Sequence, residues 1–395
     1  SLRQAEFDYD NFVFVTLAAR NDWVSNLDKA NRSLFYPSAS VSFVPTTAFD
    51  GLKSDALNYL KIRAGYGTSA GFPDQNSDSY PISSRLSLDP HDFQDNPGRI
   101  IVTNTSPLTL GNPDLKPEQV SEIELGIESR WWDGRITLDA SIYQRTTTDL
   151  IVTQPLDPAS GYYRTTTNVG EIKGEGVEID LGLNLIRSDS DGFNWRSNVN
   201  FSATETTVED LGQETDLIVY SGFSNLGNAA IKGEPLGVIY GSRVLRDDAG
   251  NLVVNSAGDY VQDSQDGIIG DPNPDFMANF NNTFSFKNFN FGFQFNWTQG
   301  GDIYSSTIST LLGRGLIVET VDRENTYILP GVKQSDGSVN DVQINNSDYF
   351  FNNVLFGPSE LQVYDGTMLR LQEVSLGYSV PKKFLDRTPL AHCHL

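Results

Sequence analysis

Residues 289–298 read Phe289-Asn290-Phe291-Gly292-Phe293-Gln294-Phe295-Asn296-Trp297-Thr298, so that large apolar residues alternate with small or polar ones. Successive side chains of a β-strand point to opposite faces, and this pattern therefore predicts a strand with one apolar and one polar face. Globular strands usually have about five or six residues, whereas a tilted strand that crosses a membrane needs about nine to eleven. The length of this segment favours a membrane-spanning strand.

The same alternation recurs in residues 122–128, 136–142, 177–185 and 193–204. Several of these segments carry Glu, Asp or Arg in the middle of the polar face, which suits a water-filled lumen. We predict ten strands, near residues 10–20, 36–46, 58–67, 119–131, 135–147, 175–186, 194–206, 275–286, 289–300 and 368–380. A soluble antiparallel sheet with one solvated face is the alternative.

The connections between these strands differ greatly in length. Trp132-Asp133-Gly134 and Lys287-Asn288 are tight turns, whereas residues 68–118, 148–174, 207–274 and 301–367 form long polar excursions, the last with helical character at 303–312. Short turns on one rim and long loops on the other are typical of outer-membrane barrels. The aromatic residues beside the short turns fit an interfacial girdle on that rim; they are Trp131, Trp132, Trp195, Phe286 and Phe289.

Composition excludes several classes of function. The chain has 28 Lys and Arg against 51 Asp and Glu, a net charge of −23, which is unsuited to binding a nucleic-acid backbone. No apolar run approaches the roughly 18 residues of a transmembrane helix. The single cysteine, Cys393, allows no internal disulfide. Three histidines, without a G-x-S-x-G or H-E-x-x-H arrangement, leave no acyl-transfer or zinc-hydrolase site. We expect a protein that is not an enzyme and that has no cofactor.

Residues 111–118 read Gly111-Asn112-Pro113-Asp114-Leu115-Lys116-Pro117-Glu118, followed by Ser121-Glu122-Ile123-Glu124-Leu125-Gly126. This stretch resembles the NPxLKPE-type signature of the SusC/RagA family of TonB-linked outer-membrane proteins. Segments 36–43, 60–67, 168–178, 270–276 and 369–378 resemble that family too, in the family's order. For Asn112, Pro113, Asp114, Leu115, Lys116, Pro117 and Glu118 we expect a structural role as an extended entry into a strand, because each proline disfavours helix in the residue before it.

The resemblance implies an all-β fold, namely an antiparallel transmembrane β-barrel of about 22 strands with long extracellular loops. This chain would supply about ten of those strands in a partial barrel domain over residues 1–390, with an off-pattern tail at 391–395. The plug domain, the TonB-contacting segment and the last strands are expected to lie outside it. Ser1-Leu2-Arg3-Gln4 does not resemble a signal peptide, so we expect an internal fragment or a processed chain.

For function, the resemblance implies TonB-dependent uptake of an oligosaccharide or peptide across the outer membrane of a Bacteroidota-like bacterium. The expected partners are a SusD-like surface lipoprotein that covers the barrel, TonB through the missing N-terminal region, and membrane lipid. Two other classes stay open: a passive porin or adhesin barrel, and a soluble all-β carbohydrate-binding protein or glycosidase.

Aromatic residues in two of the long loops are candidate contacts for a sugar ring or for the covering lipoprotein, although loop packing explains them equally well; they are Tyr162, Tyr163, Tyr220 and Phe223. Asp263, Asp266 and Asp271 are a weak Ca²⁺ candidate because carboxylate oxygens suit hard cations. Their spacing does not match a calcium-binding loop, and a solvated acidic loop is favoured. The His392-Cys393-His394 run invites a metal site, but it lies where the family pattern stops, and a frame error or the ragged end of a partial gene is the favoured interpretation.

Overall fold

The computed structural model describes residues 2–73, 82–84, 86–95, 99–105, 107–188, 192–212, 216–223 and 225–381. The chain divides into two compact units. Unit 1 consists of Ser1–Asp216, Asn281–Gly292 and Ser375–Leu395, and unit 2 of Leu217–Phe280 and Phe293–Val374. None of the helices in the described ranges has the length and apolarity needed to span a bilayer. The tail predicted at 391–395, with His392, Cys393 and His394, lies outside the described residues.

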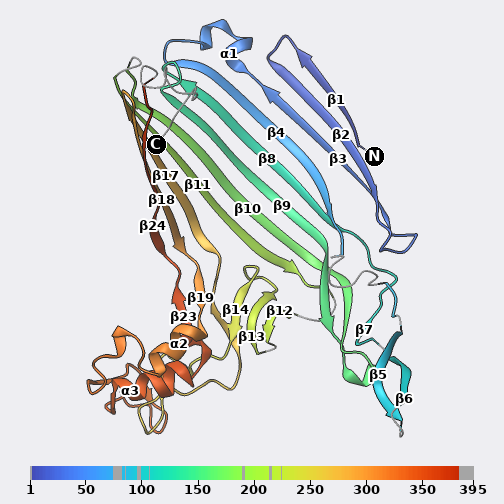
Figure 1. Cartoon of the computed structure of the whole chain (residues 1–395), viewed down its shortest axis with the longest axis vertical. Coiled ribbons are helices and arrows are strands. Elements are labelled where there is room, and N and C mark those ends of the chain that lie inside the picture. The colour runs from blue at the N-terminus through green and yellow to red at the C-terminus, as the bar shows by residue number, and fades with distance from the viewer. Residues whose placement is uncertain are drawn as a thin grey trace. The chain divides into compact units, whose positions relative to one another are not determined.

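Unit 1 is built on one large sheet with the strand order β1-β2-β3-β4-β8-β9-β10-β11-β17-β18-β24 (Figure 1). Neighbours from β1 to β11 pair antiparallel. The strands are β1 (Leu2–Tyr9), β2 (Val13–Trp23), β3 (Ser33–Phe43), β4 (Leu57–Gly71), β8 (Glu118–Trp131), β9 (Ile136–Pro155), β10 (Arg164–Ile186), β11 (Phe193–Asp210), β17 (Pro274–Phe286), β18 (Phe289–Gly300) and β24 (Met368–Tyr378). The last three strands contain residues of both units.

Smaller elements of unit 1 lie in its connections. They are α1 (Pro45–Ala48), the 3₁₀ turns η1 (Asp50–Leu52) and η2 (Pro158–Ser160), the hairpin of β5 (Ser87–Asp95) with β6 (Arg99–Thr105), and β7 (Thr109–Leu110), which pairs with β10. The link from β4 to β8, predicted as a loop over 68–118, thus contains strands of its own.

Each of the ten predicted strand ranges overlaps a strand of the structure, so their positions are confirmed. β1 was not predicted, because its alternation is interrupted by charged residues on both faces. Residues 10–12 join it to β2; the Phe12 amide donates to the Tyr9 carbonyl at 3.1 Å, and the two residues between them, Asp10 and Asn11, have positive φ, 48° and 58°. Positive φ at both central positions is the requirement of the tight hairpin turn that matches strand twist.

The prediction of a loop over 148–174 was wrong, because β9 and β10 continue through most of it as one long hairpin. Only residues 156–163 separate the two strands. Threonines at 146–148 and 165–167 favour strand, since β-branched side chains pack well on a pleated surface. Within this hairpin Asp149 and Gly170 lie opposite each other, and both have positive φ, 54° and 68°. The pairs on either side of them, Leu150 with Val169 and Thr148 with Glu171, keep the same register. These strands of 20 and 23 residues are about twice as long as the roughly nine to eleven residues that a strand needs to cross a bilayer.

Unit 2 shows that the long predicted excursions are folded rather than open loops. Its elements are β12 (Leu217–Phe223), β13 (Leu226–Ile231), β14 (Val238–Gly241), β15 (Val253–Val254), β16 (Gly267–Gly270), β19 (Asp302–Tyr304), α2 (Ser306–Gly313), η3 (Val318–Thr320), β20 (Thr326–Ile328), β21 (Val332–Lys333), β22 (Gln343–Asn345), α3 (Asn346–Asp348), the π-helix η4 (Tyr349–Leu355), η5 (Ser359–Gln362) and β23 (Val363–Asp365). The sheet β12-β13-β14-β16 and three two-stranded ladders organise it. Helix α2 confirms the helical character predicted at 303–312.

A small core holds part of unit 2 together. Val254, Leu329 and Ile344 are buried, and three tyrosines pack against them; these are Tyr260, Tyr327 and Tyr349. Burial raises the pKa of Tyr327, and the neighbouring Tyr349 adds to the effect. The phenol is therefore neutral at physiological pH, as its apolar surroundings require.

Candidate functional site

One face of the unit 1 sheet is apolar across eight strands. Strand register places two rows of residues side by side: Tyr9, Val13, Phe43, Ile62, Ile127, Ala140, Ile179 and Phe201 in one, and Phe7, Val15, Val41, Ala64, Leu125, Ile142, Val177 and Ala203 in the other. Many of these large side chains are exposed, including Leu125 at 52% and Ile142 at 57%. An exposed apolar patch that crosses eight strands is far larger than the apolar patches found on soluble monomers. It is the surface expected where a strand sheet contacts lipid.

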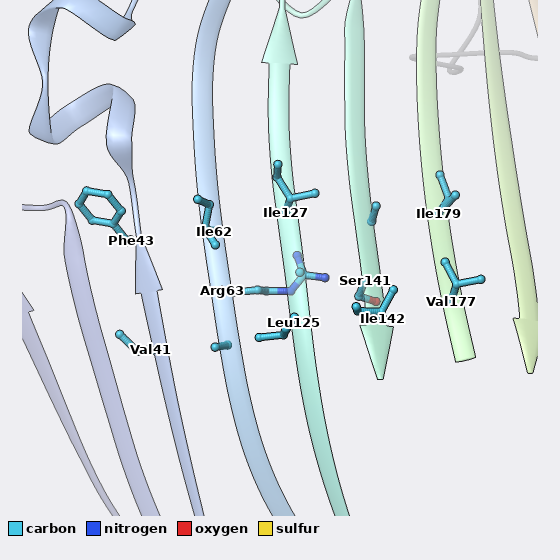
Figure 2. A pocket seen from close by; sticks show the side chains of 13 residues that line it. Val41, Phe43, Ile62, Arg63, Leu125, Ile127, Ser141, Ile142, Val177 and Ile179 are labelled. Carbon is cyan, nitrogen blue, oxygen red and sulfur yellow. The ribbon is translucent and has the colours of Figure 1, made fainter. Parts of the chain in front are cut away.

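Figure 2 shows the middle of this face, where Val41, Phe43, Ile62, Leu125 and other residues surround a shallow hollow. The small side chains of Ala64 and Ala140 lie in the lining, between larger neighbours. The hollow has a volume of about 480 Å³.

The opposite face of the same strands is polar and carries ion pairs. Arg63 on β4 donates from Nε to Glu124 on β8 at 3.2 Å, and from Nη1 to Asp139 on β9 at 2.8 Å. Its guanidinium lies over Gly126, whose missing side chain leaves the space. Figure 2 shows the Arg63 side chain reaching from β4 across β8. Alternation predicts which residues share this face, but the Arg63–Gly126 contact depends on the register between strands, which alternation does not provide.

Further polar contacts continue along this face. Arg145 on β9 pairs with Glu122 on β8 at 2.6 Å. Asp180 on β10 accepts hydrogen bonds from Asn198 at 3.1 Å and Asn200 at 2.5 Å, both on β11. These side chains are largely hydrated: 55% of the Arg145 side chain is exposed. A hydrated face that offers both charge signs and amide groups suits the wall of an aqueous conduit.

Four of the five aromatic residues predicted beside the short turns take part in ring-to-ring contacts. The rings of Trp131 and Trp132, next to the β8–β9 turn, are 6.1 Å apart. Trp195 stacks on Phe284 at 5.5 Å, and its indole N–H donates to Asn282 at 3.0 Å. A girdle at the membrane interface requires such amphipathic rings, but these contacts equally stabilise the hairpins.

The motif at residues 112–118 is anchored to β10. Asn168 donates from Nδ2 to the Lys116 carbonyl at 2.8 Å, and its Oδ1 accepts from the Lys116 amide at 2.7 Å. Asn112 donates to the Thr166 carbonyl at 3.0 Å. Leu115 is fully buried. The structural role of the motif stays a prediction, and the contacts identify a partner, Asn168, that the motif alone does not reveal.

The four aromatic residues predicted as ligand contacts fall into two groups, one in each unit. Tyr162 and Tyr163 lie in the β9–β10 connection of unit 1, where Tyr163 is 59% exposed. Tyr220 and Phe223 lie on β12 of unit 2, and Phe223 is 75% exposed. All four stay predictions.

The structure does not bring the three candidate calcium ligands together. Asp263 pairs with Arg243 at 3.3 Å, and Asp271 accepts from the amide and side chain of Asn273. Within the described part of the chain, no three carboxylate, histidine or cysteine side chains gather into a group that could hold a metal ion. The favoured alternative of a solvated acidic loop fits Asp247, which organises a turn; hydrogen bonds from Asn251 lower the pKa of its carboxyl.

Comparison with known proteins decides the family. The model of the family described as "TonB dependent receptor-like, beta-barrel" matches residues 4–307. The chain belongs to this family. Members of the family are outer-membrane β-barrel proteins.

Named relatives agree with this assignment and with the SusC/RagA resemblance. TonB-dependent receptor P3 of Formosa agariphila is 26% identical over 98% of this chain and 39% of that protein. TonB-dependent receptor SusC of Bacteroides thetaiotaomicron is 22% identical over 96% of the chain and 37% of that protein. A solved structure of the RagAB peptide importer in its closed-closed state has a TM-score of 0.77 at 18% identity, over all of this chain and 42% of the other, which shows a shared fold. This chain thus spans about two fifths of the length of these relatives.

Proposed function

We propose that this chain forms part of the wall and outer loops of a transporter that imports an oligosaccharide or a peptide across the outer membrane, driven through TonB. The observation that carries the proposal is the two-faced sheet of unit 1. Its apolar face suits lipid, and its polar face, with Arg63 between Glu124 and Asp139, suits a hydrated conduit.

The rest of the barrel wall is supplied by further strands of the same protein. Among the described strands, β1 and β24 are the two ends of the sheet order. A strand edge left unpaired in lipid is unfavourable because its amide and carbonyl groups have no hydrogen-bonding partner. The eleven strands of this sheet order would then form about half of the closed barrel of about 22 strands that the resemblance to the SusC/RagA family implies. A SusD-like surface lipoprotein covers the long-loop side, and Tyr162 and Tyr163 are candidate contacts for it.

Uptake by the host strain tests the proposal. In-frame deletion of the gene should abolish uptake of a labelled oligosaccharide or a labelled peptide, and a protonophore should stop the same uptake in the parent strain. Uptake that is lost on deletion but continues with the protonophore would instead indicate a passive porin. The protein should fractionate with the outer membrane and migrate faster on an unboiled gel than on a boiled one. Recovery of the protein in the soluble fraction without detergent would overturn the proposal in favour of a soluble all-β protein.

A further inference from the structure

A second cavity lies within unit 2. It has a volume of about 390 Å³ and is bordered by the β12–β13 hairpin, Pro272 and β19. Phe223 and Ile303 form its exposed rim, at 75% and 56% exposure, while Ile239 is buried in its wall at 5%. Pockets that bind small molecules or single side chains fall in this size range and are similarly apolar.

The strand that carries Phe223 requires a glycine at the preceding position. Gly222 has a φ of 101°, a value that side-chain-bearing residues rarely adopt, and a Cβ there would lie 2.7 Å from the Leu226 carbonyl oxygen. Phe223 pairs with Leu226 directly across this turn. The exposed phenyl ring therefore belongs to a strand residue that is paired with its neighbour.

The polar groups of the pocket are dominated by one carboxylate. Asp302 carries the only formal charge among the described residues that line it, and no Lys or Arg belongs to that lining. Its Oδ2 accepts from the Asp271 amide at 2.8 Å, which fixes the carboxylate and leaves Oδ1 available to a ligand. Asn228 adds an amide, which donates to the Gly237 carbonyl at 2.9 Å.

The surroundings of Asp302 favour a cation. Asp365 lies directly opposite Asp302 in the β19–β23 ladder, and residues paired in this way project from the same face. Unit 2 as a whole has 7 Lys and Arg against 18 Asp and Glu. A positive group that enters the pocket is attracted by this acidic surrounding, whereas an anionic ligand would be repelled.

We propose that this pocket binds a Lys or Arg side chain of a peptide, an inference that rests on the proposed function and names its substrate class. The apolar lining matches the methylene stem of such a side chain, whose charged head can then reach the carboxylate. The ring of Phe223 at the rim can make a cation–π contact with the charged head of the entering side chain. A neutral sugar could stack on Phe223, but it would leave the carboxylate without a counter-charge.

The test measures binding of short peptides to the detergent-purified intact protein by calorimetry. The probes are Ala-Ala-Lys-Ala-Ala, the same peptide with norleucine in place of lysine, and a neutral glucan oligosaccharide. We expect the lysine peptide to bind at least tenfold more tightly than either of the others, and its affinity to fall with added salt. Asp302→Asn should remove that preference while retaining an acceptor for the Asp271 amide. Phe223→Leu should weaken the lysine peptide severalfold.

Asp248→Asn is the matched control, because Asp248 is an exposed acidic residue of the same unit outside the pocket. It should leave the affinity unchanged. Equal binding of the lysine and norleucine peptides, tighter binding of the glucan, or an unchanged preference in Asp302→Asn would each overturn the inference. Uptake in the host strain distinguishes this failure from failure of the proposed function: TonB-dependent uptake of an oligosaccharide without lysine-peptide binding removes only the pocket assignment. Lysine-specific binding by a protein that performs no uptake removes only the transport proposal.

Discussion

The guanidinium of Arg63 on β4 lies directly over Gly126 on β8, so closely that a Cβ at residue 126 would be 2.5 Å from the Cζ and Nε of the arginine. The two residues are paired in the strand register. This position of the side chain allows it to reach both Glu124 and Asp139, which belong to two successive strands. A glycine in the middle of a strand is normally unfavourable, and here it provides the space for an ionic link across three strands.

Gly126→Ala should therefore destabilise the folded protein by about 1–3 kcal/mol, the usual cost of overpacking, since Arg63 must leave its two carboxylates. The measurement is the urea midpoint for loss of the fast-migrating folded band in detergent. Gly65→Ala is the control on the same face, because its new Cβ would meet nothing closer than the Ser40 Cβ at 3.8 Å. In the double variant with Arg63→Ala, Gly126→Ala should lose most of its effect. Equal midpoints for Gly126→Ala and Gly65→Ala would contradict this account.

The two faces of β10 allow a sharp test of which face meets lipid. Val177 belongs to an apolar row, and Glu178 is exposed on the polar face. Val177→Lys should destabilise the protein in lipid vesicles by about 2–4 kcal/mol, because an ammonium group would lie among acyl chains, and Glu178→Lys by much less. The readout is the urea dependence of folding into vesicles, monitored by tryptophan fluorescence. A larger loss for Glu178→Lys than for Val177→Lys would reverse the assignment of the faces.

Much of the unit 1 sheet could be predicted because alternation is a local property. The side-chain period of two identifies each strand and its apolar face from the sequence alone, as in residues 289–298. Alternation fails where a strand is charged on both faces or where its pairing partner decides its length. β1 has charges on both faces at Arg3 and Glu6, and the extension of β9 and β10 depends on pairing between their Thr-rich ends, which neither segment reveals by itself.

The site was harder to predict because its contacts join residues that are distant in the chain. Asp302 and Asp365 are opposite each other only through the β19–β23 ladder. Asn168 meets Lys116 across 52 residues. Among the four aromatic residues selected from loop position, only Phe223 lines the pocket in unit 2. These contacts form because the long excursions fold into unit 2. No periodic pattern in the sequence predicts how those excursions fold.

Asn168 should be the residue that holds the 112–118 motif in place. Asn168→Asp keeps an acceptor for the Lys116 amide but loses the two donations to the carbonyls of Lys116 and Asp149, both at 2.8 Å. Each lost hydrogen bond contributes about 0.5–1.5 kcal/mol. We expect faster proteolytic cleavage within the motif. Lys116→Gln is the control, because Asn168 contacts only the backbone of Lys116; cleavage as fast as in Asn168→Asp would show that the lysine side chain matters instead.

Glu360 should make the stability of unit 2 sensitive to acid. Burial raises the pKa of its carboxyl, but hydrogen bonds from Arg246 and from the Val244 amide, together with the charges of Arg246 and Arg243, outweigh burial and hold the pKa below its usual value. A lowered folded-state pKa means that the stabilisation is complete above the ordinary glutamate pKa, about 4.3, and is lost as the pH falls through the folded value. Hydrogen exchange of the Val244 amide, corrected for its intrinsic pH dependence, should show protection at pH 7 that decreases on acidification below that range.

Two substitutions at Glu360 separate its charge from its role as an acceptor. Glu360→Gln should remove the acid sensitivity while an amide oxygen still accepts from the buried Val244 amide, which is 2.8 Å from Glu360 Oε2 in the native protein. Glu360→Ala should also leave that amide without a partner, at a further cost of about 1–3 kcal/mol in local stability. If protection in Glu360→Gln declines with acid as it does in the native protein, another group must titrate. If Glu360→Ala protects the amide as well as Glu360→Gln does, the Val244 hydrogen bond contributes nothing to local stability.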